Sequence, residues 1–169
     1  MAAQTSVKIT EVQRVRAITL WSPWASLIVC GAKKIETRSW STKIRGTVAI
    51  HAAKKVPLEA IQLLATKAFQ EGLKILLPKN MKDIIMEFLP RGKVIGTVDI
   101  IDCVEIVGKL KNGYPLVVFK SEVKSIVGPE VLFGDFTRGR YAWILENPVM
   151  FEKPIPAMGS QGFWNWMKE

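Results

Sequence analysis

Three residues with chemically active side chains lie close together early in the chain: Lys33, Glu36 and Arg38 place two cations around one carboxylate. Alternate residues of an extended strand share a face, so Glu36 and Arg38 would project on the same side. The carboxylate can pair with a cation and hold elements together, or accept hydrogen bonds from the amino group of a nucleobase. Both interpretations stay open for Glu36 and Arg38. Lys33, directly after an expected helix end, favours a phosphate-binding or catalytic role.

Basic residues and tryptophans are concentrated in the first third of the chain. The net charge is +9 over 169 residues, and residues 1–56 hold ten basic side chains against two acidic ones. Such an excess suits either a surface that faces a polyanion or a merely solvated surface. Trp21, Trp24 and Trp40 lie among these bases, and flat rings beside cations favour stacking on nucleobases next to phosphates. We therefore expect phosphate contacts from several of Lys33, Lys34, Arg38, Lys43, Arg45, Lys54 and Lys55.

Each candidate residue also has an ordinary structural interpretation. Trp24 on a helix face is more often a core residue than a stacking platform, whereas Trp40, among polar neighbours, fits either role. Tyr141 and Trp143 share a strand face, which favours packing in the core. His51 is the single histidine, and a histidine within a strand is usually hydrogen-bonded rather than catalytic. We include it among the residues expected to bind a ligand.

The composition argues against several classes of protein. Cys30 and Cys103 lie in apolar runs and are expected to be buried thiols. With one histidine and two cysteines, a zinc site of four nitrogen or sulfur ligands is disfavoured, so we expect neither a metal nor a cofactor. The apolar runs are too short for a membrane span, and the first residues do not resemble a secretory signal. The sequence therefore predicts a cytoplasmic protein that does not enter a membrane, with a monomer favoured.

The elements that must position these residues are predicted to be mostly strands. Ser22 is expected to cap a helix whose first position is Pro23 and which ends at Gly31. Residues 115–119 suit either a strand or a short helix, and the prolines at 148, 154 and 156 suggest an extended edge or linker. Strands are predicted from apolar periodicity over residues 17–20, 33–40, 47–53, 93–101 with a continuation to 107, and 140–145.

A helical insertion interrupts the strands at about residues 57–90. Its first helix ends at Gly72, and a second candidate runs from about Met81 to Leu89. Residues 1–14 are expected to form a flexible N-terminal arm, and residues 15–169 a single domain. About five or six strands, with the helices gathered in one insertion, predict an α+β fold: a small, partly closed mixed β-barrel with helices packed outside it.

The run from Gly31 to Arg38 resembles the motif of the ASCH domain, a branch of the PUA-like β-barrel superfamily. Gly31, Lys33, Glu36 and Arg38 fill the four positions of the pattern Gly-x-Lys-x-x-Glu-x-Arg. The flanking residues resemble the ASCH domain of transcriptional coactivator proteins, and the likeness continues at residues 92–99, 139–143 and 159–164, so that it covers roughly residues 15–165.

This resemblance implies a cleft between barrel and helices that binds RNA or a nucleotide, with the motif lining it. We expect RNA rather than DNA, and ligand contacts from Trp24, Lys33, Glu36, Arg38, Trp40, Arg45, His51, Lys54 and Lys55. Some relatives are hydrolases of RNA or of acetylated cytidine, and in the amidohydrolase branch the motif lysine works with a threonine three residues later. Here Glu36 stands at that place, so a hydrolase that uses Lys33 and Glu36 is the alternative function. A domain that binds proteins in a transcription or translation complex is a second alternative.

Overall fold

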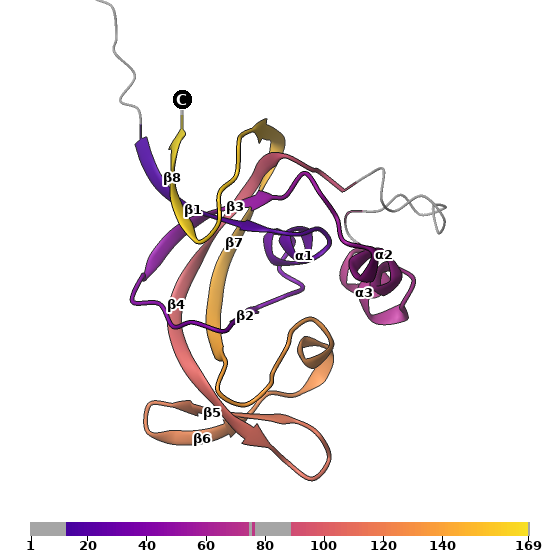
Figure 1. Cartoon of the computed structure of the whole chain (residues 1–169), viewed down its shortest axis with the longest axis vertical. Helices are drawn as coiled ribbons and strands as arrows, with labels where there is room; N and C mark the ends of the chain where they lie inside the picture. The colour runs from indigo at the N-terminus through magenta and orange to yellow at the C-terminus, as the bar shows by residue number, and fades with distance from the viewer. Residues whose placement is uncertain (1–12, 75, 77–88, 169) are drawn as a thin grey trace, which may run out of the picture.

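Two very long strands, β4 (Lys93–Lys109) and β7 (Tyr141–Pro156), form the backbone of the fold (Figure 1). The computed structural model describes residues 13–74, 76 and 89–168. The second helix expected at residues 81–89 falls almost entirely outside this part of the chain. The other described elements are β1 (Gln13–Leu20), α1 (Trp24–Val29), β2 (Ile35–Arg38), β3 (Gly46–Ala52), α2 (Leu58–Leu64), α3 (Lys67–Gly72), β5 (Pro115–Phe119), β6 (Glu122–Ser125), the 3-10 helix η1 (Gly128–Leu132) and β8 (Phe163–Lys168).

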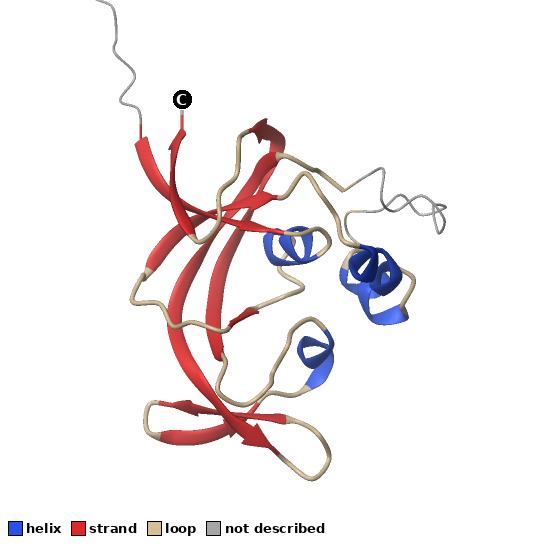
Figure 2. Ribbon diagram, in the orientation of Figure 1, coloured by secondary structure: helices blue, strands red, loops and turns tan. Residues whose placement is uncertain are grey.

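The strands form one mixed sheet in the order β2-β7-β4-β3-β1-β8, with β5 and β6 extending from β4. Strands β1 and β3 are parallel, and the other pairs are antiparallel. Register shifts interrupt the pairing of β4 with β7 at three places, and such bulges increase the bend and twist of a sheet. The sheet therefore curls into a half-barrel, and the helices lie together on one side of it (Figure 2). The expected α+β fold is confirmed, with eight strands in the described residues rather than five or six.

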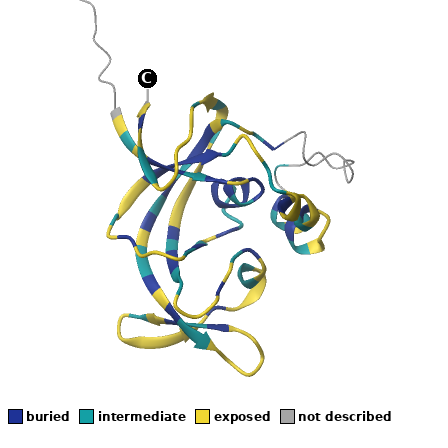
Figure 3. Cartoon of the chain, in the orientation of Figure 1, coloured by how far each residue is buried: buried dark blue, intermediate teal, exposed yellow. Residues whose placement is uncertain are grey.

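The core divides between the interior of the half-barrel and the helices beside it. The main cluster joins apolar side chains of β1, β3, β4 and β7 to α1, whose residues 25–29 are all buried (Figure 3). A second cluster packs Leu27 of α1 against Phe69 of α3 and Phe133 after η1. Helix α1 is therefore held on both sides, which fixes the start of the segment that leads into β2.

Several local expectations differ from the structure. Ser22 does not cap α1: its hydroxyl donates a hydrogen bond to the carbonyl oxygen of Pro90 at 3.3 Å, and Pro23 occupies the N-cap position. The strand predicted over residues 33–40 is limited to Ile35–Arg38, and Trp40 lies beyond its end. Cys30 and Cys103 are free thiols that are only partly buried.

The proline-containing segment after residue 146 is part of β7 rather than a linker. Pro148 and Pro154 fall inside two of the register shifts between β7 and β4, where a residue without an N–H breaks no ladder hydrogen bond. Pro156 ends the strand, paired with Lys93. None of the helices in the described part of the chain is both long and apolar enough to span a membrane.

Candidate nucleic-acid interface

A cleft of about 1630 Å³ opens between the curled sheet and the helices. Its walls come from segments far apart in the sequence: the end of β1 and the start of α1, strand β2, the residues after β3, the segment before β4, the loop after η1, and the residues between β7 and β8. A space of this volume exceeds the roughly 300–1,000 Å³ typical of sites for one drug-sized molecule. The cleft is therefore large enough for an extended ligand.

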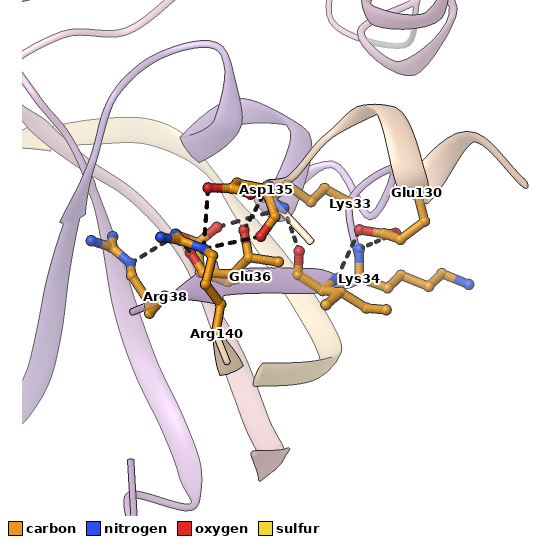
Figure 4. Close-up of polar contacts among 9 residues, drawn as sticks. Lys33, Lys34, Glu36, Arg38, Glu130, Asp135 and Arg140 are labelled. Carbon is orange, nitrogen blue, oxygen red and sulfur yellow. Dashed lines mark hydrogen bonds and ion pairs between the residues drawn. The ribbon is translucent and has the colours of Figure 1, made fainter. Parts of the chain in front are cut away.

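Glu36 lies in the wall of the cleft and carries the densest set of charged contacts (Figure 4). Its Oε1 is 2.9 Å from Nε of Arg38, and its Oε2 is 3.6 Å from Nζ of Lys33. The exposed fractions of the three side chains are 12% for Glu36, 27% for Arg38 and 1% for Lys33. Glu36 and Arg38 line the cleft, whereas Lys33 does not. Lys33 lies behind the carboxylate, where its ammonium group also donates a hydrogen bond to the carbonyl oxygen of Ile35.

The outer edge of β2 is covered by side chains from the segment after β6. The carboxylate of Glu130 accepts the backbone N–H groups of Lys34 at 2.8 Å and Ile35 at 3.0 Å. Burial raises the pKa of Glu130, although the Lys34 N–H bond, the charge of Lys33 and the Ile35 N–H bond all act in the opposite direction. These contacts fix the position of the motif strand.

Further along β2, the loop after η1 is attached by two neighbouring residues. The hydroxyl of Thr37 accepts the N–H of Asp135 at 3.0 Å, and the guanidinium of Arg140 donates to the Thr37 carbonyl oxygen at 3.3 Å. Arg140 and Asp135 also form an ion pair at 3.3 Å. The pKa of Asp135 is lowered chiefly because its carboxylate accepts the hydroxyl of Thr137. Asp135 and Arg140 both line the cleft, and they were not among the residues expected there.

Tryptophan side chains reach the cleft from two sides. Trp40 packs edge-on against Trp143 and Phe163, which stack on each other at 5.3 Å, and it remains 37% exposed. Trp24 packs edge-on against Phe69 and is partly buried, so it has a core contact as well as a place in the cleft. Trp21 is 55% exposed and also lines the cleft. Trp143 itself is buried, as expected of a core residue.

Cations without acidic partners gather at one end of the cleft. Lys54 and Lys55 follow β3, Arg91 precedes β4, and none of the three forms an ion pair with a described residue. Arg45 differs: it pairs with Asp102 at 2.9 Å and does not line the cleft. An unpaired ammonium or guanidinium group beside a cleft is available to neutralise an anionic ligand.

His51 attaches one wall of the cleft to the sheet. Its Nε2 is 3.1 Å from the carbonyl oxygen of Ala157, which only accepts, so Nε2 carries the proton. The unprotonated Nδ1 then accepts the hydroxyl of Thr19 at 3.2 Å, and Thr19 in turn accepts the indole N–H of Trp164 at 3.1 Å. Burial lowers the pKa of His51, against a smaller upward effect of the Ala157 carbonyl. A Cβ on Gly159 would overlap the imidazole ring, so glycine allows this segment to lie against it.

Seven of the nine residues expected to bind a ligand line the cleft: Trp24, Glu36, Arg38, Trp40, His51, Lys54 and Lys55. Lys33 and Arg45 do not, because one is buried behind Glu36 and the other pairs with Asp102. Sequence reasoning missed Arg91 and Arg140, since nothing in their local sequence indicates the fold that brings them near β2 and β3. Within the described residues, no group of three or more histidine, cysteine, aspartate or glutamate side chains could hold a metal ion.

Comparison with known proteins gives two kinds of match. The ASCH domain family matches residues 18–155. Activating signal cointegrator 1 from Homo sapiens is 28% identical over 149 residues, which cover 87% of this chain and 21% of that protein. Activating signal cointegrator 1 from Mus musculus is 38% identical over 88 residues, which cover 51% of this chain and 14% of that protein. The chain thus matches no more than about a fifth of the length of these relatives.

Proposed function

The chain belongs to the ASCH domain family, and from this premise we propose that it is a binding module whose cleft takes single-stranded RNA or a nucleotide. The observation that carries the proposal is one cleft that contains exposed tryptophan rings, a carboxylate paired with an arginine, and three cations that form no ion pair with a described residue. Stacking, base-edge hydrogen bonding and phosphate neutralisation each require one of these groups.

Each group has a distinct part in this proposal. Trp40, held edge-on by two other rings, is a rigid platform for one base, and Trp21 offers a second exposed ring. Glu36 accepts from an amino or imino group of a base, while the terminal nitrogens of Arg38 donate to a carbonyl or ring nitrogen. Lys54, Lys55 and Arg91 neutralise the backbone phosphates. Base edges are available for such contacts only when the strand is unpaired, which favours a single strand over a duplex.

The position of Lys33 favours binding over hydrolysis. A general base must lie within hydrogen-bond reach of the proton that it removes, or act through one water. Lys33 is 1% exposed, lies behind Glu36 and donates to a backbone carbonyl, so its ammonium group is turned away from a ligand in the cleft. In this proposal Lys33 holds Glu36 in place and does not act as the base of a hydrolase.

The proposal is tested by fluorescence anisotropy with a labelled single-stranded octanucleotide of RNA, with its DNA counterpart as competitor. Replacing Trp21 by alanine removes one exposed ring from the cleft and should weaken binding about tenfold, since a stacked base contributes roughly 1–3 kcal/mol. Tyr114→Ala is the matched control, because Tyr114 is 37% exposed and does not line the cleft. Equal affinities of the two variants would contradict the proposal.

The same assay examines the choice of base. Glu36→Gln keeps an accepting oxygen but loses the charge and adds a donor, so it should change which homopolymer binds most tightly. Product analysis of the wild type with labelled RNA and with acetylated cytidine tests the hydrolase alternative directly. Turnover that is lost in Lys33→Ala would overturn the assignment of Lys33 as a positioning residue.

A further inference from the structure

The β5–β6 hairpin lies at the end of the molecule opposite the C-terminus (Figure 1). Among the described strands β6 pairs with β5 only. The outer edge of β2 is different, because Glu130 accepts the N–H groups of Ile35 and of the residue before it, and Arg140 donates to one carbonyl oxygen of β2. Figure 3 shows the hairpin as mostly exposed. One sheet edge is therefore covered by side chains, whereas the outer edge of β6 pairs with no strand in the described part of the chain.

The register identifies the backbone groups that face outward from β6. Lys120 and Ser121 have φ values of 49° and 66°, as in a two-residue type I′ turn, and Phe119 pairs with Glu122 across it. Residue pairs in an antiparallel ladder alternate between hydrogen-bonded and non-hydrogen-bonded. The pairs Phe119–Glu122 and Val117–Lys124 are therefore hydrogen-bonded, and the pair Val118–Val123 between them is not. The N–H of Ile126 donates a hydrogen bond to the carbonyl oxygen of Pro115 at 2.9 Å, which agrees with this alternation of bonded and non-bonded pairs.

Val123 and Ser125 consequently direct their N–H and C=O groups away from β5. In the described part of the chain these groups form no hydrogen bond, and all four residues of β6 are exposed. Two outward peptide units on one edge are sufficient to pair with an added strand of three or four residues, which is how extended peptides bind sheet edges.

The two faces of the hairpin differ in chemistry. Val118 and Val123 lie directly opposite each other and are 38% and 61% exposed, so one face is apolar. On the other face the ammonium groups of Lys120 and Lys124 lie 5.4 Å and 5.2 Å from the ring centre of Phe119. Hairpin residues 115–125 contain two lysines, Lys120 and Lys124, and a single acidic residue, Glu122, which pairs with Lys124 at 3.3 Å. The surroundings of the edge are therefore positively charged.

We propose that the open edge of β6 binds an extended segment of a partner protein in which β-branched and acidic residues alternate. A residue placed beside Val123 in the added strand shares the face of Val118 and Val123, which selects an apolar side chain. Its neighbours project to the opposite face, beside Lys124 and Lys120, which select carboxylates. This charge complementarity distinguishes the partner from a second copy of the chain, whose own lysines would be repelled at the same edge.

Nucleic acid is the less suitable occupant of this surface. Exposed valines cannot hydrogen-bond phosphates, and the outward N–H and C=O groups alternate in a pattern that matches another strand. The proposal is independent of the ligand of the cleft, because none of the hairpin residues 115–125 lines that cleft.

The test uses the full chain and a fluorescein-labelled hexapeptide of alternating glutamate and valine, with binding followed by anisotropy. Lysine in place of each glutamate should weaken binding at least tenfold. Val123→Pro removes an outward N–H without removing a bond to β5 and should also weaken binding about tenfold. Lys124→Glu should have a similar effect. Lys111→Glu, with the same change of charge in the turn between β4 and β5, should change the affinity less than twofold.

A second measurement leaves the protein unaltered, in case Val123→Pro fails to fold. N-methylation of the peptide at the residues that face β6 removes its pairing donors and should abolish binding, whereas N-methylation at the intervening residues should not. The proposal is overturned if the lysine peptide binds as tightly as the glutamate peptide, or if both N-methylated peptides bind alike. It is also overturned if Lys124→Glu weakens binding of the labelled RNA octanucleotide and leaves the peptide affinity unchanged.

Discussion

At the scale of single residues, the motif forms one ion-pair network that is partly buried and partly lines the cleft. Glu36 contacts both Lys33 and Arg38, but only Glu36 and Arg38 reach the cleft. The two interpretations that the sequence left open for Glu36 are therefore compatible with each other. Spacing alone could not place Lys33, because a position just after a helix end does not determine whether the side chain points into the cleft or behind it.

Replacing Glu36 by glutamine should reduce stability, because it leaves the buried ammonium group of Lys33 without its carboxylate partner. Breaking a buried ion pair from one side costs roughly 3–5 kcal/mol, and the part-exposed position of Glu36 reduces the expected loss to about 2 kcal/mol. Chemical denaturation of Glu36→Gln, Lys33→Met and the double variant measures the coupling free energy between the two side chains. The double variant should be more stable than the sum of the single losses implies. Additive losses in the free energy of unfolding would show that the Lys33–Glu36 ion pair does not contribute to stability.

At the scale of elements, the strands with an apolar residue at every second position could be predicted, and the irregular ones could not. Residues 47–53 and 93–107 correspond closely to β3 and β4, because apolar residues recur at alternate positions, as at Val48, Ile50 and Ala52 in β3. The second half of β7 could be predicted only as an extended edge or a linker, because its prolines cannot donate hydrogen bonds to a neighbouring strand, and the register shifts make room for Pro148 and Pro154. The cleft wall between β7 and β8 has no local signal, since His51 and Thr19 hold it from distant strands.

A side chain at Gly159 should disturb this wall. The Cβ of Gly159→Ala would overlap the ring of His51 and the hydroxyl of Thr19, so the segment must move away from the sheet. We expect weaker binding of the labelled octanucleotide by about fivefold or more, together with a lower melting temperature. Gly108→Ala is the matched control, because a Cβ there meets nothing within 4 Å. Unchanged RNA binding by Gly159→Ala would contradict a role for this segment in the cleft.

His51 should make stability depend on pH in a defined direction. Burial lowers its pKa in the folded protein, so the unfolded chain binds a proton more readily. The stability from neutral His51 is present above the unfolded pKa of about 6.5 and is lost as the pH falls through that value toward the folded pKa. Denaturation at several values between pH 7.5 and pH 5 should show a smaller loss for His51→Gln than for the wild type. Comparing the two proteins at each pH cancels the contribution of Glu130, whose raised pKa acts in the opposite sense.

At the scale of the whole molecule, folding redistributes the positive charge that the sequence places in its first third. Lys54 and Lys55 come to one end of the cleft, while Arg45 is neutralised by Asp102 outside it. Arg91 and Arg140 join the cleft from later parts of the chain, where basic and acidic residues are almost balanced in number. The overall excess of positive charge could be predicted from the sequence, but the position of that charge on the surface depends on the long-range pairing of the strands.

The salt dependence of RNA binding measures whether the cations of the cleft neutralise backbone phosphates. If three to five of the cations that line the cleft each neutralise one phosphate, the logarithm of affinity should fall with the logarithm of salt concentration at a slope of about −2 to −3.5, roughly 0.7 per phosphate. Replacing Lys54 and Lys55 together by alanine should reduce the magnitude of that slope by about 1.4, equally for RNAs of different sequence. Arg45→Ala, outside the cleft, should leave it unchanged. An affinity that does not vary with salt, or a slope unaffected by loss of Lys54 and Lys55, would contradict the account.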